Sequence, residues 1–167
     1  MSYTEHKCQS FRNVKCAVLT VSDSRSRETD DSGKIISEKL EEQGHLVAYY
    51  NIIKDDLEAI QSEVKLLLDD ENIQAIIING GTGISRKDVT IEAVMPYIEK
   101  ELEGFGELFR FLSYKEIGSS AMMSRALAGK ARDKVVICLP GSPNAVKLGL
   151  EKLIIPELGH MVWEASR

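Results

Sequence analysis

Short apolar segments alternate with amphipathic helical segments along this chain, and this alternation limits the folds available to it. Four segments have the length of strands: 14–21 (VKCAVLTV), 46–53, 73–78 and 135–139 (VVICL). Three of them are apolar at almost every position, which is typical of strands with both faces covered, as in a parallel sheet. The sequence therefore predicts a three-layer α/β/α domain around a mostly parallel sheet.

Helical segments fill the intervals between these strands. Apolar residues at helical spacing indicate helices over 33–44 and 57–68, and Gly44 is a natural stop for the first. We expect further helices over 90–101 and 119–127, an interruption at 104–106 (GFG), and a last helix that begins at Pro143 with Ser142 as N-cap. Pro156 should kink that helix or begin a new segment. No repeat or linker divides the chain, so we expect one domain over 14–167 after a flexible polar arm at 1–13.

Composition and charge exclude several classes of protein. Of the 167 residues, 43% are hydrophobic and 28% charged, as in ordinary soluble domains. No apolar run approaches the roughly 20 residues that a membrane span needs, and the N-terminal segment lacks the apolar core of a signal peptide. We therefore expect a cytoplasmic protein without a membrane partner. The net charge of −5 argues against binding nucleic acid.

The cysteines and histidines have no spacing that suits a disulfide framework or a zinc site. They are Cys8, Cys16, Cys138, His6, His45 and His160. No Ser/His/Asp or Cys/His set for covalent catalysis stands out. Neither GxxxxGK[ST] nor GxGxxG occurs, which excludes a P-loop protein and a standard dinucleotide-binding domain.

The most informative motif is Asn79-Gly80-Gly81-Thr82-Gly83, which ends the apolar segment 73–78. Glycines at the carboxyl end of a strand allow positive φ angles and leave room for a ligand against the main chain. The amides of such a loop can point at an anion, and Arg86 and Lys87 add positive charge nearby. One glycine would satisfy a tight turn, so three of them predict a loop that binds phosphate or carboxylate.

Two other polar segments are expected at the same edge of the sheet. The segment 22–27 (SDSRSR) leaves the first strand with hydroxyl and guanidinium groups that suit phosphate oxygens, although an ordinary turn uses the same residues. The segment 140–144 (PGSPN) leads into a helix N-terminus, which favours an anion. Loops after successive parallel strands share one edge because crossovers are right-handed. The prediction fails if the turns at 80–83 and 141–144 lie at opposite ends of the sheet.

Three carboxylates next to these loops each have two interpretations. Asp55, with Glu58 three residues later, resembles a capping box, but Asp55 or Asp56 could instead hold a divalent metal together with substrate phosphates. Asp88 could cap the helix expected at 90, but its place just beyond the glycine loop favours ligand contact. The segment 119–126 (SSAMMSRA) favours a closely packed helix, from which a ligand could still be reached by Ser119, Ser120 and Arg125.

Together these segments resemble the MoaB/MogA family of molybdenum-cofactor biosynthesis, and most closely its MoaB members. The similarity runs from about Val14 to Pro156. It rests on TVSDS at 20–24, GGTGISRKDVT at 80–90, GFGELFR at 104–110, SSAMMSRALAG at 119–129 and LPGSPNAV at 139–146, in that order. The resemblance implies a molybdopterin-binding fold that forms trimers or hexamers. It also implies MgATP-dependent adenylylation of molybdopterin, with pyrophosphate released.

The resemblance further implies roles for individual residues. The aspartate linked to catalysis maps onto Asp55, which would hold Mg²⁺, although Asp56 competes for that position. The aspartate linked to pterin binding maps onto Asp88. The remaining expected contacts to molybdopterin and ATP are Ser22, Asp23, Ser24, Gly80, Gly81, Thr82, Gly83, Ser119, Ser120, Arg125, Pro140, Gly141, Ser142 and Asn144. The alternative is a protein that binds molybdopterin without adenylylating it.

Overall fold

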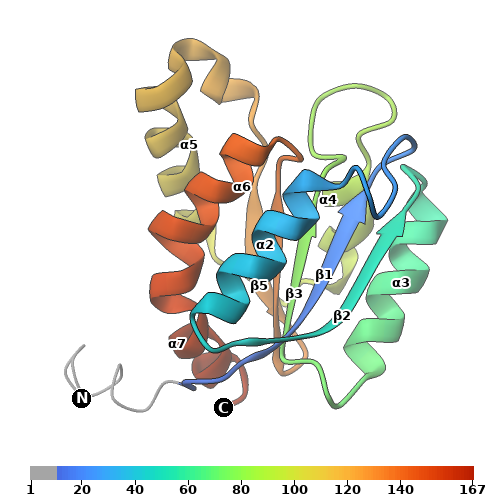
Figure 1. Cartoon of the computed structure of the whole chain (residues 1–167), viewed down its shortest axis with the longest axis vertical. Helices are drawn as coiled ribbons and strands as arrows, with labels where there is room; N and C mark the ends of the chain where they lie inside the picture. The colour runs from blue at the N-terminus through green and yellow to red at the C-terminus, as the bar shows by residue number, and fades with distance from the viewer. Residues whose placement is uncertain (1–10) are drawn as a thin grey trace.

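A sheet of six strands forms the centre of the computed structural model, which describes residues 11–167 (Figure 1). Most of the arm predicted at 1–13, with His6 and Cys8, lies outside the described residues. The strand order is β2 (Leu46–Ile53), β1 (Lys15–Val21), β3 (Ala75–Asn79), β6 (Lys134–Leu139), β5 (Leu127–Ala131) and β4 (Lys100–Glu101). The pairs β2–β1, β1–β3 and β3–β6 are parallel, and β6–β5 and β5–β4 are antiparallel.

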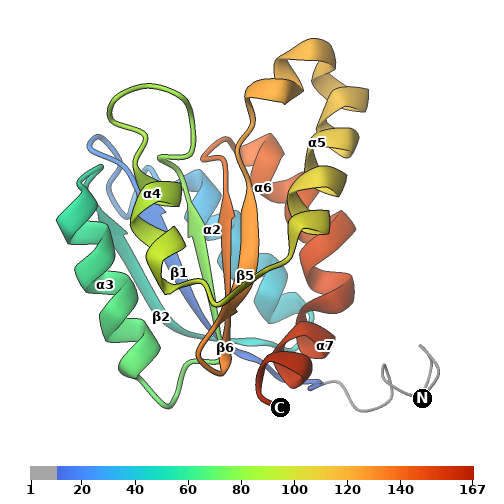
Figure 2. The same ribbon diagram turned by 180° about the vertical axis from the view of Figure 1, so that it is seen from behind.

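Helices cover both faces of the sheet, as Figures 1 and 2 show from opposite sides. One face carries α2 (Asp31–Glu42), α5 (Glu103–Ile117), α6 (Pro143–Gly149) and α7 (Ile155–Ala165), and the other carries α3 (Leu57–Asp69) and α4 (Thr90–Val94). Successive side chains of β3 alternate between the two cores: Ile77 packs with α2 and α7, and Ile76 and Ile78 with α3 and α4. Burial on both faces explains why this strand is apolar from Ala75 to Ile78, and the predicted three-layer fold is confirmed.

Several boundaries agree with the sequence. Asp30 caps α2, which begins two residues earlier than expected, and its carboxylate accepts a hydrogen bond from the Gly33 amide. Ser142 caps α6 with Pro143 in the first turn, as predicted. A π-helical turn over Leu150–Ile154 separates α6 from α7, and Pro156 lies in the first turn of α7, where a proline needs no backbone donor.

Three predicted helical features are wrong. The helix expected over 90–101 ends at Val94, and a 3₁₀ turn, Met95–Tyr97, and β4 follow, because Pro96 cannot continue an α-helix. The helix expected over 119–127 is a 3₁₀ segment, η2 (Gly118–Met123), which leads into β5. The expected interruption at 104–106 lies inside α5. There Phe105 and Phe109 are both buried, with ring centroids 6.4 Å apart, and this packing outweighs the low helix propensity of glycine.

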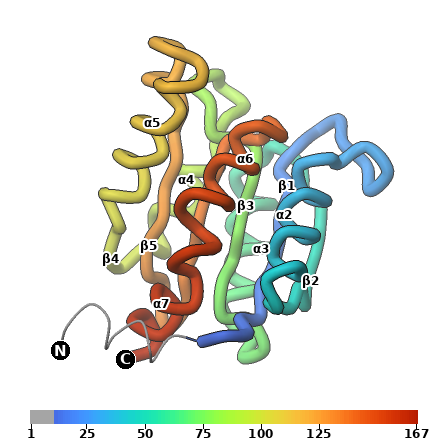
Figure 3. The backbone as a smooth tube through the Cα atoms, turned by 60° about the vertical axis from the view of Figure 1, so that its left-hand side comes forward, coloured from blue at the N-terminus to red at the C-terminus, as the bar shows by residue number. Residues whose placement is uncertain are grey.

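The chain connections place a topological switch point between β1 and β3, and the space outside the carboxyl ends of these two strands is termed the crevice. From β1 the chain crosses through α2 to β2 on one side, then returns through α3 to β3 on the other side of β1. Figure 3 shows the result from another direction, with α2 and β2 at one end of the sheet and β5 and α5 at the other. Ligands of open α/β sheets bind at such a switch point, outside the carboxyl ends of the strands. Within residues 11–167, no helix has the length and apolar character needed to cross a membrane.

Candidate functional site

The glycine turn packs directly on the end of β1. Gly80 and Gly81 have φ angles of +91° and +63°, which side-chain-bearing residues rarely adopt. A Cβ atom on Gly80 would lie 2.3 Å from the carbonyl oxygen of Val21, and the Gly80 amide donates a hydrogen bond of 3.0 Å to the Leu139 carbonyl. The turn therefore lies between the carboxyl ends of β1 and β6.

The other two polar segments lie at the same edge of the sheet. A Cβ atom on Gly141 would come within 3.0 Å of the Gly80 Cα atom, so the two turns touch. The Ser22 amide donates a hydrogen bond of 2.8 Å to the Ile53 carbonyl, which ties the segment 22–27 to the end of β2. The predicted convergence of the three loops is therefore confirmed, and Figure 1 shows them together above the sheet.

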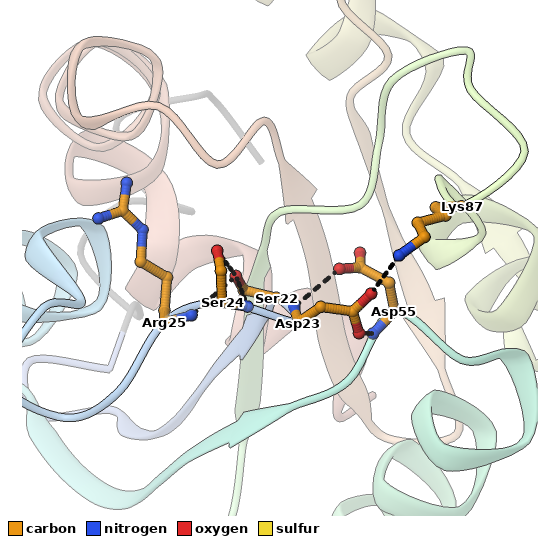
Figure 4. A network of polar contacts seen from close by, with 6 residues as sticks. All are labelled: Ser22, Asp23, Ser24, Arg25, Asp55 and Lys87. Carbon is orange, nitrogen blue, oxygen red and sulfur yellow. Dashed lines mark hydrogen bonds and ion pairs between the residues drawn. The ribbon is translucent and has the colours of Figure 1, made fainter.

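Asp23 and Asp55, which follow the neighbouring strands β1 and β2, face each other at this edge (Figure 4). The Asp23 amide donates to Asp55 Oδ2 at 3.0 Å, and the Asp55 amide donates to Asp23 Oδ1 at 3.2 Å. Lys87 Nζ lies 2.7 Å from Asp23 Oδ2. Its hydrogen bond lowers the pKa of Asp23, whereas partial burial and the charges of Asp23 and Asp88 raise the pKa of Asp55. A divalent cation would relieve this concentration of negative charge.

The neighbouring carboxylate, Asp56, caps α3. Its side chain accepts a hydrogen bond of 2.9 Å from the Ala59 amide. The capping box expected at Asp55 is therefore wrong by one residue, because the Asp55 carboxylate is turned toward the Asp23 amide instead. Since Asp56 caps α3, Asp55 is the one of these two adjacent aspartates that faces the crevice.

Asp88 folds back onto the glycine loop. Its Oδ2 atom accepts a hydrogen bond of 2.9 Å from the Ser85 amide, and a Cβ atom on Gly83 would lie 2.7 Å from the same oxygen. Hydrogen bonds from Ser85 are the main reason that the pKa of Asp88 is lowered. The N-cap of α4 is Val89, which makes no side-chain capping bond, so the capping interpretation of Asp88 is wrong. Asp88 is partly buried and shapes the loop that carries Lys87.

Arg125 holds the same loop through hydrogen bonds to its backbone. Its Nε atom donates to the Thr82 carbonyl at 2.8 Å and one terminal nitrogen donates to the Asp88 carbonyl at 3.2 Å. The guanidinium also pairs with the Glu92 carboxylate. These three partners occupy Arg125, so its observed role is to position the loop. Thr82, next to the glycines, is buried.

The remaining candidate residues differ in their exposure and in the segment of the chain that carries them. Ser22 Oγ accepts hydrogen bonds of 3.2 Å from the amides of Ser24 and Arg25, which shapes the first loop. Pro140 is half-buried beside the crevice, whereas Ser119 and Ser120 are exposed on η2. Asn144 is exposed and lines a hollow of about 430 Å³ together with Glu116, Lys147, Leu148, Glu151 and Lys152.

A buried polar network under the crevice was not predicted. Asn79 Nδ2 donates to Thr20 Oγ1 at 2.9 Å, and Thr20 Oγ1 donates to Asp30 Oδ2 at 2.5 Å. Tyr50 donates to the same oxygen at 2.6 Å. Asn79 and Asp30 are each 1% exposed, and Asn79 Oδ1 has no hydrogen-bond partner in the described part of the chain. Polar residues at the last positions of apolar strands were the signal that sequence reasoning overlooked.

The donor set fits a metal that arrives with a phosphorylated substrate. Among residues 11–167 no three His, Cys, Asp or Glu side chains group as metal ligands. Asp23 and Asp55 supply two carboxylates, and Mg²⁺ in proteins is commonly held by one or two carboxylates plus substrate phosphates and water. Burial raises the pKa of both Cys16 and Cys138 to about 12, so these thiols are poor metal ligands and poor nucleophiles.

Over residues 17–160 the sequence matches the family described as "probable molybdopterin binding domain". The chain belongs to this family. Molybdenum cofactor biosynthesis protein B of Bacillus subtilis is 54% identical to it, over 100% of this chain and 99% of the relative. A crystal structure of a molybdenum cofactor biosynthesis protein B, 52% identical, has a TM-score of 0.89 and covers 92% of this chain and 96% of its own. The tungsten cofactor synthesizing protein MoaB from Pyrococcus furiosus is 39% identical, with a TM-score of 0.81 over 95% and 100% of the two chains. These similarities confirm the family resemblance and the fold.

Proposed function

We propose that this chain binds molybdopterin and adenylylates it with MgATP. The observation that carries the proposal is the pairing of Asp23 with Asp55 between two polar loops at the switch point of the sheet. Family membership supports molybdopterin as one substrate. Two neighbouring polar loops with carboxylates beside them suit a reaction that joins two phosphorylated molecules through a metal.

In the proposed reaction, a phosphate oxygen of molybdopterin attacks the α-phosphorus of ATP. A new phosphorus–oxygen bond forms, the bond from the α-phosphorus to the bridging oxygen breaks, and pyrophosphate leaves with that electron pair. Mg²⁺, when bound with ATP, neutralises charge on the triphosphate. Chemistry of this kind depends mainly on positioning and electrostatic stabilisation.

Each group of residues then has a defined task. Asp55 and Asp23 hold and orient the metal-bound triphosphate. The amides of Gly81 and Thr82 and the N-terminus of α6 bind phosphate oxygens, with Ser22 and Ser24 as further polar contacts. Asp88 keeps the loop in shape and accepts hydrogen bonds from polar groups of the pterin. Thus the proposal keeps the catalytic and pterin-binding roles expected of Asp55 and Asp88.

We further propose that copies of the chain associate through α5, in keeping with the trimer or hexamer that the family resemblance implies. Leu108, Phe111, Tyr114 and Ile117 are exposed on this helix, and Met122 on η2 is 80% exposed. Several large apolar side chains exposed on neighbouring elements are typical of a protein interface. Ser119 and Ser120 would then lie at a boundary between subunits.

Pyrophosphate release tests the proposed reaction. The purified protein, given ATP, Mg²⁺ and molybdopterin, should release pyrophosphate and form adenylyl-molybdopterin. Asp55→Asn should abolish release and still bind molybdopterin. Asp56→Asn is the matched control, because it changes the adjacent carboxylate, which caps α3. Full turnover in Asp55→Asn would remove Asp55 from the mechanism, and molybdopterin binding without release by the unaltered protein would establish the non-catalytic alternative.

A further inference from the structure

Lys87 brings a positive charge across to the carboxylate pair. It extends from the loop that follows the glycine turn and reaches over to Asp23, which leaves β1 on the other side of the crevice (Figure 4). Its Nζ atom lies 2.7 Å from Asp23 Oδ2, while Asp23 Oδ1 and Asp55 Oδ2 accept backbone amides. The ammonium therefore uses the carboxylate oxygen of Asp23 that is not already bonded to Asp55.

A divalent cation that binds Asp23 and Asp55 would compete with this ammonium. Both cations would need the same oxygen, and two positive charges a few ångströms apart repel each other. The ion pair between Lys87 and Asp23 is exposed, with 75% and 43% of the side chains accessible to solvent. Exposed pairs are weak and change an equilibrium constant by no more than about fivefold, so displacement costs little.

Only the Lys87 side chain needs to move. The backbone of its loop is fixed at both ends, since the Thr90 amide donates to the Gly81 carbonyl at 3.0 Å and Arg125 holds the Thr82 carbonyl. Lysine carries its charge on a flexible four-carbon stem, which can turn from one oxygen to another without a change in the backbone. A triphosphate whose metal lay between Asp23 and Asp55 would present its oxygens within reach of that stem.

We propose that Lys87 is a phosphate-binding residue that Asp23 holds until a metal-bound triphosphate displaces it, after which the ammonium pairs with the phosphates. The second half of this inference rests on the nucleotide of the proposed function. The first half, competition between Lys87 and a divalent cation, is independent of any reaction that the protein catalyses.

The two halves predict opposite effects of Lys87→Met, and this provides the test. Binding of Mn²⁺ alone, measured by electron paramagnetic resonance at pH 7, should tighten by about two- to fivefold because the competitor is gone. Binding of the Mg²⁺ complex of α,β-methylene ATP, measured by calorimetry, should weaken by about threefold or more because a phosphate contact is lost. Lys87→Arg keeps the charge and should behave as the unaltered protein in the Mn²⁺ measurement.

Arg86→Met is the matched control. Arg86 is the neighbouring cation on the same exposed loop, and within residues 11–167 it forms no ion pair. The Arg86→Met variant therefore measures how the loss of one nearby positive charge changes Mn²⁺ affinity. The Mn²⁺ affinity of Lys87→Met is compared with that of Arg86→Met. Mn²⁺ affinity that rises no more in Lys87→Met than in Arg86→Met overturns the proposal, as does undiminished nucleotide affinity or the absence of Mn²⁺ binding in every variant. If both predicted effects appear but molybdopterin is not adenylylated, the proposed function fails and the role of Lys87 stands.

Discussion

Replacing Gly81 with alanine should lower the free energy of unfolding for two reasons, its backbone conformation and its contact with Thr90. Gly81 has a φ angle of +63°, where an L-residue costs about 1–2 kcal/mol. The new Cβ atom would lie 2.3 Å from Thr90 Oγ1, so this buried hydroxyl must move and give up its 2.9 Å hydrogen bond to the Gly80 carbonyl. A broken buried hydrogen bond costs about 1–3 kcal/mol. The free energy of unfolding should therefore fall by about 2–5 kcal/mol.

Adding Thr90→Ala to Gly81→Ala should cost little more. Thr90→Ala alone loses the same hydrogen bond, about 1–3 kcal/mol. In the double variant that bond is lost only once, because no hydroxyl remains to meet the Cβ atom. The double variant should thus be more stable than the sum of the single effects predicts, by about 1–3 kcal/mol.

Urea unfolding of the four proteins at pH 7, followed by circular dichroism, measures this coupling energy. Gly104→Ala serves as a control, because an added Cβ atom there has nothing within 4 Å and the residue lies in α5. Because Gly104 lies in the first turn of α5, this substitution should stabilise the protein by less than about 1 kcal/mol. Single effects that add to within about 0.5 kcal/mol in the double variant would refute the reasoning, since independent sites are additive to that extent.

Three other outcomes are expected. His45 Nδ1 accepts the Val14 amide at 3.1 Å and burial lowers the pKa of His45 below 6.5. The unfolded chain then binds the proton more readily than the folded protein, so stability should fall as the pH drops through 6.5. His45→Gln should make this loss of stability smaller. Urea midpoints measured at pH 7.5 and pH 5.5 test this. Arg125→Met should speed hydrogen exchange in residues 82–89 at least tenfold, because loss of the bond to the Thr82 carbonyl costs about 1.5–3 kcal/mol locally, whereas unchanged exchange would deny it a positioning role. Phe111→Lys should shift sedimentation toward the monomer if α5 forms the subunit interface, and an unchanged sedimentation coefficient would exclude that face.

The layers of the fold were predictable because burial leaves a direct mark on the sequence. β1, β3 and β6 lie in the interior of the sheet, and their apolar runs identified them to within two residues. β5 was missed because Leu127–Ala131 (LAGKA) consists mostly of small residues, whose strand propensity is low. What makes it a strand is its antiparallel pairing with β6, a contact between chain segments that periodicity within one segment does not report.

The candidate site was predictable as a meeting of loops but not as a set of contacts. The rule that loops after parallel strands share an edge brought residues 22–27, 80–83 and 141–144 together without any structure. Which of two adjacent aspartates caps α3 depends on where the Asp23 amide lies, and that amide is 32 residues from Asp55. The prediction that Asp55 caps the helix used only residues close in sequence. It was wrong because Asp55 accepts a hydrogen bond from the distant Asp23 amide instead.

Polar residues under the crevice join the two strand ends from which the Asp23 loop and the glycine turn leave. Thr20 precedes the loop that carries Asp23, and Asn79 precedes the glycine turn. Thr20 accepts from Asn79 and donates to Asp30, so the directions of both hydrogen bonds are determined. Buried networks become rigid when every polar atom has a partner, and here Asn79 Oδ1 alone lacks one among the described residues. Asp23 and the glycine turn therefore follow strand ends that are bonded to each other, which lowers the cost of ordering these two loops when a ligand spans them.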